Sequence, residues 1–235
     1  MNNQNHTFSY RGNYQAEDLL GWALEEYSPR IALACSFQTT VLVHMVKQIR
    51  SDVRVFAIDT GRLNEETYEC ARDVERALDV KIEWYFPKHQ AVEALVSSKG
   101  MFSFKEGLDA RRECCGIRKV EPLNRALSGL DAWITGIRRD QGDARKNIDK
   151  IEIDDAHAGI VKINPIADWS PEDIRKYVTK HRLPYNLLLE QGYGSVGCEC
   201  CTRPLKTGES TRAGRWWWED SEQKECGLHV RNWNI

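Results

Sequence analysis

The stretch IALACSFQTT at residues 31–40 indicates the fold of this chain. Its first five residues are an apolar run with the length of a buried strand, and the polar turn Ser36–Gln38 follows at once. The next segment has a helical pattern, which predicts a helix from Thr39 to about Ile49. A buried strand, a polar turn and a helix in this order are typical of the first part of a βαβ unit.

The rest of the chain repeats this order. Further strands are predicted at residues 53–58, 81–86, 132–135 and 160–163. Helices are predicted at about residues 65–78, 89–99 and 171–181, the last of them after a serine cap. Residues 148–153 alternate apolar and polar side chains, which predicts an edge strand. Strands that alternate with helices indicate an α/β fold, in which a parallel sheet carries helices on both faces.

The composition changes at Gly192. Glycine, cysteine, arginine and tryptophan dominate from there to the end, without helical or strand periodicity. We therefore expect an α/β domain over residues 1–191 and an irregular C-terminal segment over residues 192–235. Something other than a hydrophobic core is expected to hold this segment.

Charge and hydropathy exclude several classes of protein. The net charge of −2 gives no strong overall field to attract nucleic acid or a membrane surface. Residues 1–6 are polar and lack a signal region, and no apolar run approaches the roughly 20 residues that a membrane span needs. We expect a cytoplasmic protein that binds neither nucleic acid nor membrane. Whether it forms a homo-oligomer is left open by the sequence.

Three polar turns follow predicted strands, and their residues are candidates for binding a nucleotide. They comprise Ser36, Phe37, Gln38 and Thr39; Asp59, Thr60, Gly61 and Arg62; and Gly136, Arg138 and Arg139. A single serine or threonine after a strand is usually a helix cap. In an open parallel sheet, however, ligands bind beyond the carboxyl ends of the strands. Three such turns on one edge predict that the α/β domain binds a nucleotide.

Five of the eight cysteines form two groups with the spacing of metal ligands. Cys114 and Cys115 are adjacent, and Cys198 and Cys201 form a CxxC pair with Cys200 between them. Two residues between thiolates let both reach one ion or cluster, and adjacent thiolates can bind different irons of a [4Fe–4S] cube. The spacing alone leaves open a [4Fe–4S] cluster, a zinc ion, or a pair of merely buried cysteines at 114 and 115.

The other three cysteines are expected to differ in role. Cys35 and Cys70 fall in predicted core elements, which favours a structural role. Cys226 stands in a polar segment, and Lys224 and His229 would each lower the pKa of its thiol. In an intracellular chain, this setting favours a nucleophile over a solvent-exposed thiol without a task.

Together these features resemble the assimilatory adenylyl-sulfate reductases, the iron–sulfur branch of the sulfonucleotide reductases. The resemblance extends from about residue 31 to residue 229 and rests on motifs in the family's order. They are DTGRL at residues 59–63, CCGIRKVEPL at 114–123, GIRRDQ at 136–141, GCECCTRP at 197–204, RAGRWWWE at 212–219 and KECGLH at 224–229. The resemblance implies a fold like that of the adenine-nucleotide α-hydrolases.

The resemblance also implies the chemistry. Cys114, Cys115, Cys198 and Cys201 would bind a [4Fe–4S] cluster, and Cys226 would be the nucleophile. The reaction would reduce adenylyl sulfate to sulfite and AMP, within sulfate assimilation and cysteine biosynthesis, with electrons from thioredoxin or a glutaredoxin-like carrier. Phosphate and sulfate need cations, and guanidinium groups bind such oxyanions bidentately. The candidates are Lys119, Arg138, Arg139, Arg145, Arg212 and Arg215, with His229 beside Cys226.

Three other functions compete with this one. The nearest is a reductase of 3′-phosphoadenylyl sulfate, or of both nucleotides; relatives specific for that substrate generally lack the paired cysteines and the CxxC pair. An ATP-pyrophosphatase of similar fold would carry Ser-Gly-Gly-x-Asp-Ser in its first turn, which residues 36–40 lack. A non-catalytic, metal-sensing nucleotide-binding module would not need Cys226 within its motif.

Overall fold

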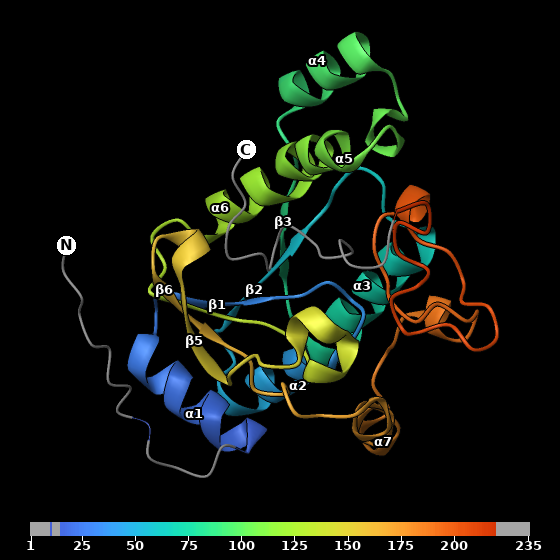
Figure 1. Ribbon diagram of the computed structural model, residues 1–235. Helices are drawn as coiled ribbons and strands as arrows, with labels where there is room; N and C mark the ends of the chain where they lie inside the picture. Colours follow the sequence, from blue (N-terminus) through green and yellow to red (C-terminus); the bar gives the residue numbers. More distant parts are fainter. Residues whose placement is uncertain (1–9, 11–14, 220–235) are drawn as a thin grey trace.

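The computed structural model describes Tyr10 and residues 15–219, so Cys226 and His229 lie outside the described residues. Its centre is a six-stranded sheet with the order β3-β2-β1-β4-β6-β5 (Figure 1). The strands are β1 (Ile31–Ala34), β2 (Arg54–Ile58), β3 (Ile82–Tyr85), β4 (Ala132–Ile134), β5 (Ile151–Asp154) and β6 (Ile160–Ile163). All neighbouring pairs are parallel except β5 with β6. The predicted parallel sheet and its edge strand are confirmed.

Helices alternate with these strands. They are α1 (Ala16–Tyr27), α2 (Val41–Ile49), α3 (Glu65–Leu78), α4 (His89–Lys99), α5 (Leu108–Cys115), α6 (Glu121–Leu127) and α7 (Pro171–His181). A π-helical turn, Gly116–Val120, joins α5 to α6, so that the two run as one bent rod in Figure 1. At the start of α7, Ser170 accepts a hydrogen bond from the Asp173 amide, as its capping sequence predicts.

The two faces of the sheet are covered by different helices. On one face, α1, α2 and α3 bury side chains such as Leu20, Val43 and Val74 in the larger core. Helix α6 lies on the other face (Figure 1). Its Leu123 packs in a smaller core with Trp133 of β4. The prediction of helices on both faces is therefore confirmed. None of the helices that the structure describes is long and apolar enough to cross a membrane.

Three helices, α1, α5 and α6, were absent from the prediction. Helix α1 lies before residues 31–40, where the prediction of elements began. It was not predicted, although Leu20 and Leu24 recur at helical spacing. Helix α5 has no apolar stripe, because its buried residues are Arg111, Cys114 and Cys115. An amphipathic pattern cannot reveal a helix whose buried face is charged or sulfur-bearing.

The strand order creates a place for a ligand. From β1 the chain moves to β2 and β3 on one side, and it later returns to the other side of β1 as β4. In doubly wound sheets, a crevice opens beyond the carboxyl ends of the strands where the order reverses in this way. Here that place lies between the turns that follow β1 and β4.

Candidate active site

A cavity of about 180 Å³ lies at this reversal point. Its wall is formed by the turns after β1, β2 and β4, by the π-helical turn, and by two parts of the C-terminal segment. Ten of the predicted substrate-binding residues line it: Ser36, Phe37, Gln38, Thr39, Thr60, Lys119, Gly136, Arg145, Arg212 and Arg215. The three separate polar turns of the sequence thus contribute to one cavity.

The turn after β1 connects the sheet to the C-terminal segment. Phe37 has a left-handed backbone (φ 57°), and its buried ring stacks on Trp84 with 5.7 Å between the ring centroids. The Gln38 side-chain oxygen accepts a hydrogen bond from the Val196 amide at 3.4 Å. This contact closes the cavity with residues that lie far along the chain.

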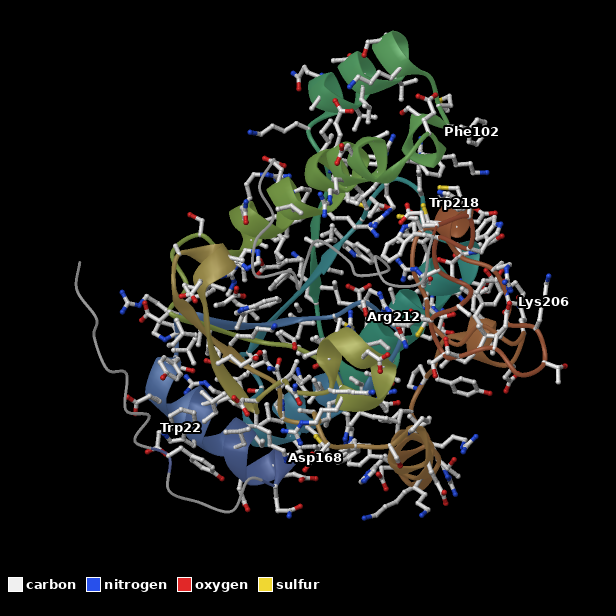
Figure 2. The ribbon with its side chains drawn as sticks, viewed as in Figure 1. Trp22, Phe102, Asp168, Lys206, Arg212 and Trp218 are labelled. Atoms are coloured by element: carbon white, nitrogen blue, oxygen red, sulfur yellow. The ribbon has the colours of Figure 1, made fainter. Side chains whose placement is uncertain are left out.

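Four cations face this cavity. Lys119, Arg145 and Arg215 are buried, and Arg212 reaches in from the C-terminal segment (Figure 2). Arg145 donates to the Gln141 side-chain oxygen at 2.5 Å. The Nε of Arg215 is buried and has no hydrogen-bond partner among residues 15–219, so a donor is left for an anion. The cavity is suited to a ligand with several negative oxygens.

The position of Arg215 depends on a glycine. Arg215 Nη1 donates a hydrogen bond to the Val196 carbonyl at 3.0 Å. A Cβ atom at position 197 would lie only 2.4 Å from Arg215 Cζ, in the space that the guanidinium occupies. The contact involves the end of a flexible side chain, so an added methyl group is expected to displace Arg215 without unfolding the chain.

We therefore expect Gly197→Ala to weaken nucleotide binding by about ten- to hundredfold, the cost of one lost charged hydrogen bond. Calorimetric titration with AMP and adenylyl sulfate measures this effect. Gly21→Ala is the matched control, because a methyl group there meets nothing within 4 Å. Unchanged affinity in Gly197→Ala would show that Arg215 does not hold the ligand.

The remaining described candidates lie outside the wall of the cavity. They are Asp59, Gly61, Arg62, Arg138 and Arg139. The Asp59 carboxylate accepts hydrogen bonds from the Gly61 amide (2.7 Å) and the Tyr68 hydroxyl (3.0 Å), which shapes the turn after β2. Arg138 pairs with Asp140 at 2.9 Å, and Arg139 donates to the Ile148 carbonyl at 2.9 Å. The contacts described for these residues are with protein groups.

The wall also contains residues that the sequence prediction missed. Thr135, Gln141 and residues 195–197 line the cavity. Gln141 and Gly197 belong to the motifs that carry the resemblance, but nothing in the residue types distinguished them from their neighbours. Outside the wall, Arg118 is buried and donates to the Thr60 carbonyl at 2.7 Å, holding the turn after β2.

The predicted ligand cysteines are gathered beside this cavity. Cys114, Cys198 and Cys201 share one buried cluster with Phe104 and Trp216, and Cys115 follows on the same buried face of α5. No group of three His, Cys, Asp or Glu side chains within the described part of the chain is placed to hold a single ion. A [4Fe–4S] cube distributes its thiolates over four irons, so they need not converge on one point.

Cations surround these cysteines. Burial raises the pKa of the Cys114 thiol, and the nearby charges of Arg62, Arg118 and Lys119 oppose that rise. Thr60 Oγ1 lies 3.2 Å from Cys198 Sγ. Four thiolates carry negative charge that buried surroundings must neutralise, so this cationic setting and all-cysteine donor set fit an iron–sulfur cluster.

Cys35 and Cys70 differ from this group. Both are buried, and burial raises the pKa of each thiol to about 12. Thiols with such pKa values stay protonated at neutral pH and are poor nucleophiles. The expected structural role of the two residues agrees with this burial.

Cys200 lies between the CxxC cysteines and is half-buried. Its Sγ is 3.8 Å from Cys201 Sγ and 3.8 Å from the guanidinium of Arg62. We predict that Cys200 does not bind the cluster, because the resemblance implies Cys114, Cys115, Cys198 and Cys201 as its four ligands.

The fold and the site define a doubly wound α/β protein with a cation-lined cavity at the reversal of strand order, beside a buried cysteine cluster. The model of the phosphoadenosine phosphosulfate reductase domain matches residues 30–204, and the chain belongs to this family. Proteins of similar sequence are adenosine 5′-phosphosulfate reductases. The one from Allochromatium vinosum is 46% identical over 200 residues, covering 85% of this chain and 78% of its own. That of Neisseria meningitidis serogroup A is 44% identical over 201 residues, covering 85% and 82%.

Solved structures share this fold. The phosphoadenylyl-sulfate reductase of Candida auris superimposes with a TM-score of 0.67 at 28% identity, covering 79% of this chain and 89% of that one. The FMN adenylyltransferase of Candida glabrata, at 12% identity and a TM-score of 0.56, covers 89% and 76% and shares the fold. The predicted fold class is confirmed.

Proposed function

We propose that this chain is a cytoplasmic adenylyl-sulfate reductase that forms sulfite and AMP through an S-sulfonate on Cys226. One observation carries the proposal: four cations line the cavity at the carboxyl ends of the strands, and one of them, Lys119, also acts electrostatically on Cys114. The names of the similar bacterial proteins support adenylyl sulfate as the substrate.

The reaction divides into two thiol steps. The Cys226 thiolate attacks the sulfate sulfur, an S–S bond forms, and the S–O bond to AMP breaks, so that AMP leaves with the bonding electrons. A dithiol carrier such as thioredoxin or a glutaredoxin-like protein then attacks Cys226 Sγ and expels sulfite. Its second thiol resolves the mixed disulfide and regenerates the Cys226 thiolate. The dithiol loses two electrons, and the sulfur gains them.

The cavity residues bind and orient the substrate. Lys119, Arg145, Arg212 and Arg215 would pair with the phosphate and sulfate oxygens. The apolar part of the wall, which includes Leu42, Phe56 and Val196, gives the nucleoside a dry surface. Charge neutralisation at the phosphate also makes AMP a better leaving group.

The four cysteines 114, 115, 198 and 201 would hold a [4Fe–4S] cluster. Thiols supply both electrons, so the cluster is not needed to transfer them. When bound, it would supply an electrostatic field beside the sulfate and order the surrounding chain. Lys119 lies between this cluster of cysteines and the cavity, so its position would depend on both.

A comparison of two nucleotides tests the function. With reduced thioredoxin, we expect sulfite release from adenylyl sulfate to exceed that from 3′-phosphoadenylyl sulfate. The reverse order would make the chain a reductase of the second nucleotide. If the chain binds nucleotide but releases sulfite from neither substrate, the function that remains is that of a non-catalytic, metal-sensing module.

We expect Arg212→Ala and Arg215→Ala each to weaken substrate binding by ten- to hundredfold, since a charged hydrogen bond contributes about 1.5–3 kcal/mol. Kinetics and AMP titration at low salt measure both effects. Arg203→Ala is the control, because Arg203 belongs to the same segment but pairs with Glu209 at 2.7 Å. Wild-type kinetics in both variants would mean that the segment does not close over the substrate.

A further inference from the structure

A buried ion pair joins α5 to the end of the described chain. Arg111 Nε donates to Glu219 Oε1 at 2.6 Å, and the two residues are 108 positions apart. Only 2% and 9% of the two side chains are exposed. Because water hardly reaches the pair, removing either partner would leave a charge buried and uncompensated. The contact therefore restrains the C-terminal segment strongly.

Arg111 restrains the same segment at a second point. Its guanidinium carbon lies 4.3 Å from the centroid of the Trp216 ring, and Trp216 is fully buried. The Trp216 amide donates to the Cys201 carbonyl at 3.0 Å. The ring centroid of Trp218 lies 6.0 Å from that of Phe104, which belongs to the turn after α4. Figure 2 shows Trp218 on the side of Phe102, in the same turn region. Residues 216–219 are thus held by contacts with distant parts of the chain.

Arg111 shares a helix face with two candidate cluster ligands. Cys114 and Cys115 follow it by three and four residues, a spacing that places side chains on one face of a helix. These three are the buried residues of α5. One helix face therefore presents both cysteines and the contact that holds residues 216–219.

We propose that Arg111 is a positioning residue for the nucleophile. Through Glu219 and Trp216 it fixes the start of the segment that leads to Cys226, relative to the helix that carries Cys114 and Cys115. The inference rests on the proposed function, because it takes Cys226 as the group that attacks the substrate.

Two variants of the full chain test it. Arg111→Met removes the charge, and Glu219→Gln keeps the shape of its side chain while removing the negative charge. We expect AMP affinity to change less than about threefold and S-sulfonate formation at saturating substrate to slow by at least about tenfold, since small misplacements cost large factors in rate. Native-state trypsin cleavage after Arg215 should become about tenfold faster, since it reports local opening. Iron content checks that the cysteine cluster is intact.

Arg112→Met is the matched control. Arg112 lies next to Arg111 on α5, and its 3.7 Å pair with Asp109 is exposed. AMP affinity, the rate of S-sulfonate formation, the rate of trypsin cleavage after Arg215 and the iron content should all stay at the wild-type values. If Arg111→Met does not fold, the gentler Glu219→Gln decides the question.

Wild-type adduct rates in Glu219→Gln would overturn the positioning role, and so would a parallel loss of AMP affinity and rate. Absence of a Cys226 adduct in the wild-type chain would instead overturn the proposed function, and the inference with it.

Discussion

Replacement of Cys226 by serine is expected to abolish sulfite release, while nucleotide binding and iron content stay at the wild-type level. Loss of a covalent nucleophile costs about 10⁶-fold in a well-studied protease, so the remaining rate should be close to background. Cys226 lies outside the described residues, and its role rests on its setting between Lys224 and His229. Steady-state assays with reduced thioredoxin measure the rate, and AMP titration measures binding.

The wild-type chain without a carrier gives the complementary result. It should release AMP once and stop, with a sulfonate of about 80 Da left on the peptide that contains Cys226. Cys35 and Cys70 should carry no adduct, because burial raises the pKa of each thiol to about 12. A sulfonate on any other cysteine, or normal turnover in Cys226→Ser, would contradict the mechanism.

The second large effect concerns iron. Serine at position 114, 115, 198 or 201 is expected to remove the [4Fe–4S] cluster, because each thiolate holds one iron. Iron and sulfide analysis of anaerobically purified protein should show nearly complete loss in each variant. The visible absorption of the wild-type chain should disappear in parallel. Zinc in place of iron in the wild-type chain would contradict the assignment.

Cys200→Ser is the matched control for this series, because Cys200 lies one residue before Cys201. It should retain both iron and absorption. An intact cluster in Cys115→Ser, together with a lost one in Cys200→Ser, would exchange the roles of these two cysteines.

Most strands and helices could be predicted from the sequence, because their pattern depends on local periodicity. The run at residues 31–35 and the capping serine at 170 predict their elements without reference to the rest of the chain. Helix α5 shows where this fails. Its buried face holds Arg111 and two cysteines, and only partners distant in sequence make such a face suitable for burial.

The candidate site divides in the same way. The polar turns at strand ends and the ligand spacing of the cysteines could be predicted from the sequence, because both features depend on residues that are close together along the chain. It could not separate Arg145, which lines the cavity, from Arg139, which donates to the Ile148 carbonyl. Both are arginines in short 3₁₀ turns after β4, and only the path of the chain decides which way each faces.

The tertiary structure alone decided how the C-terminal segment meets the sheet. Gln38 contacts Val196 across 158 residues, and Arg111 contacts Glu219 across 108. No local propensity encodes such pairs, because each forms only after the intervening chain has folded and the loop between its partners has closed. The sequence determined the fold and the inventory of reactive groups; tertiary packing determined which of those groups share one cavity.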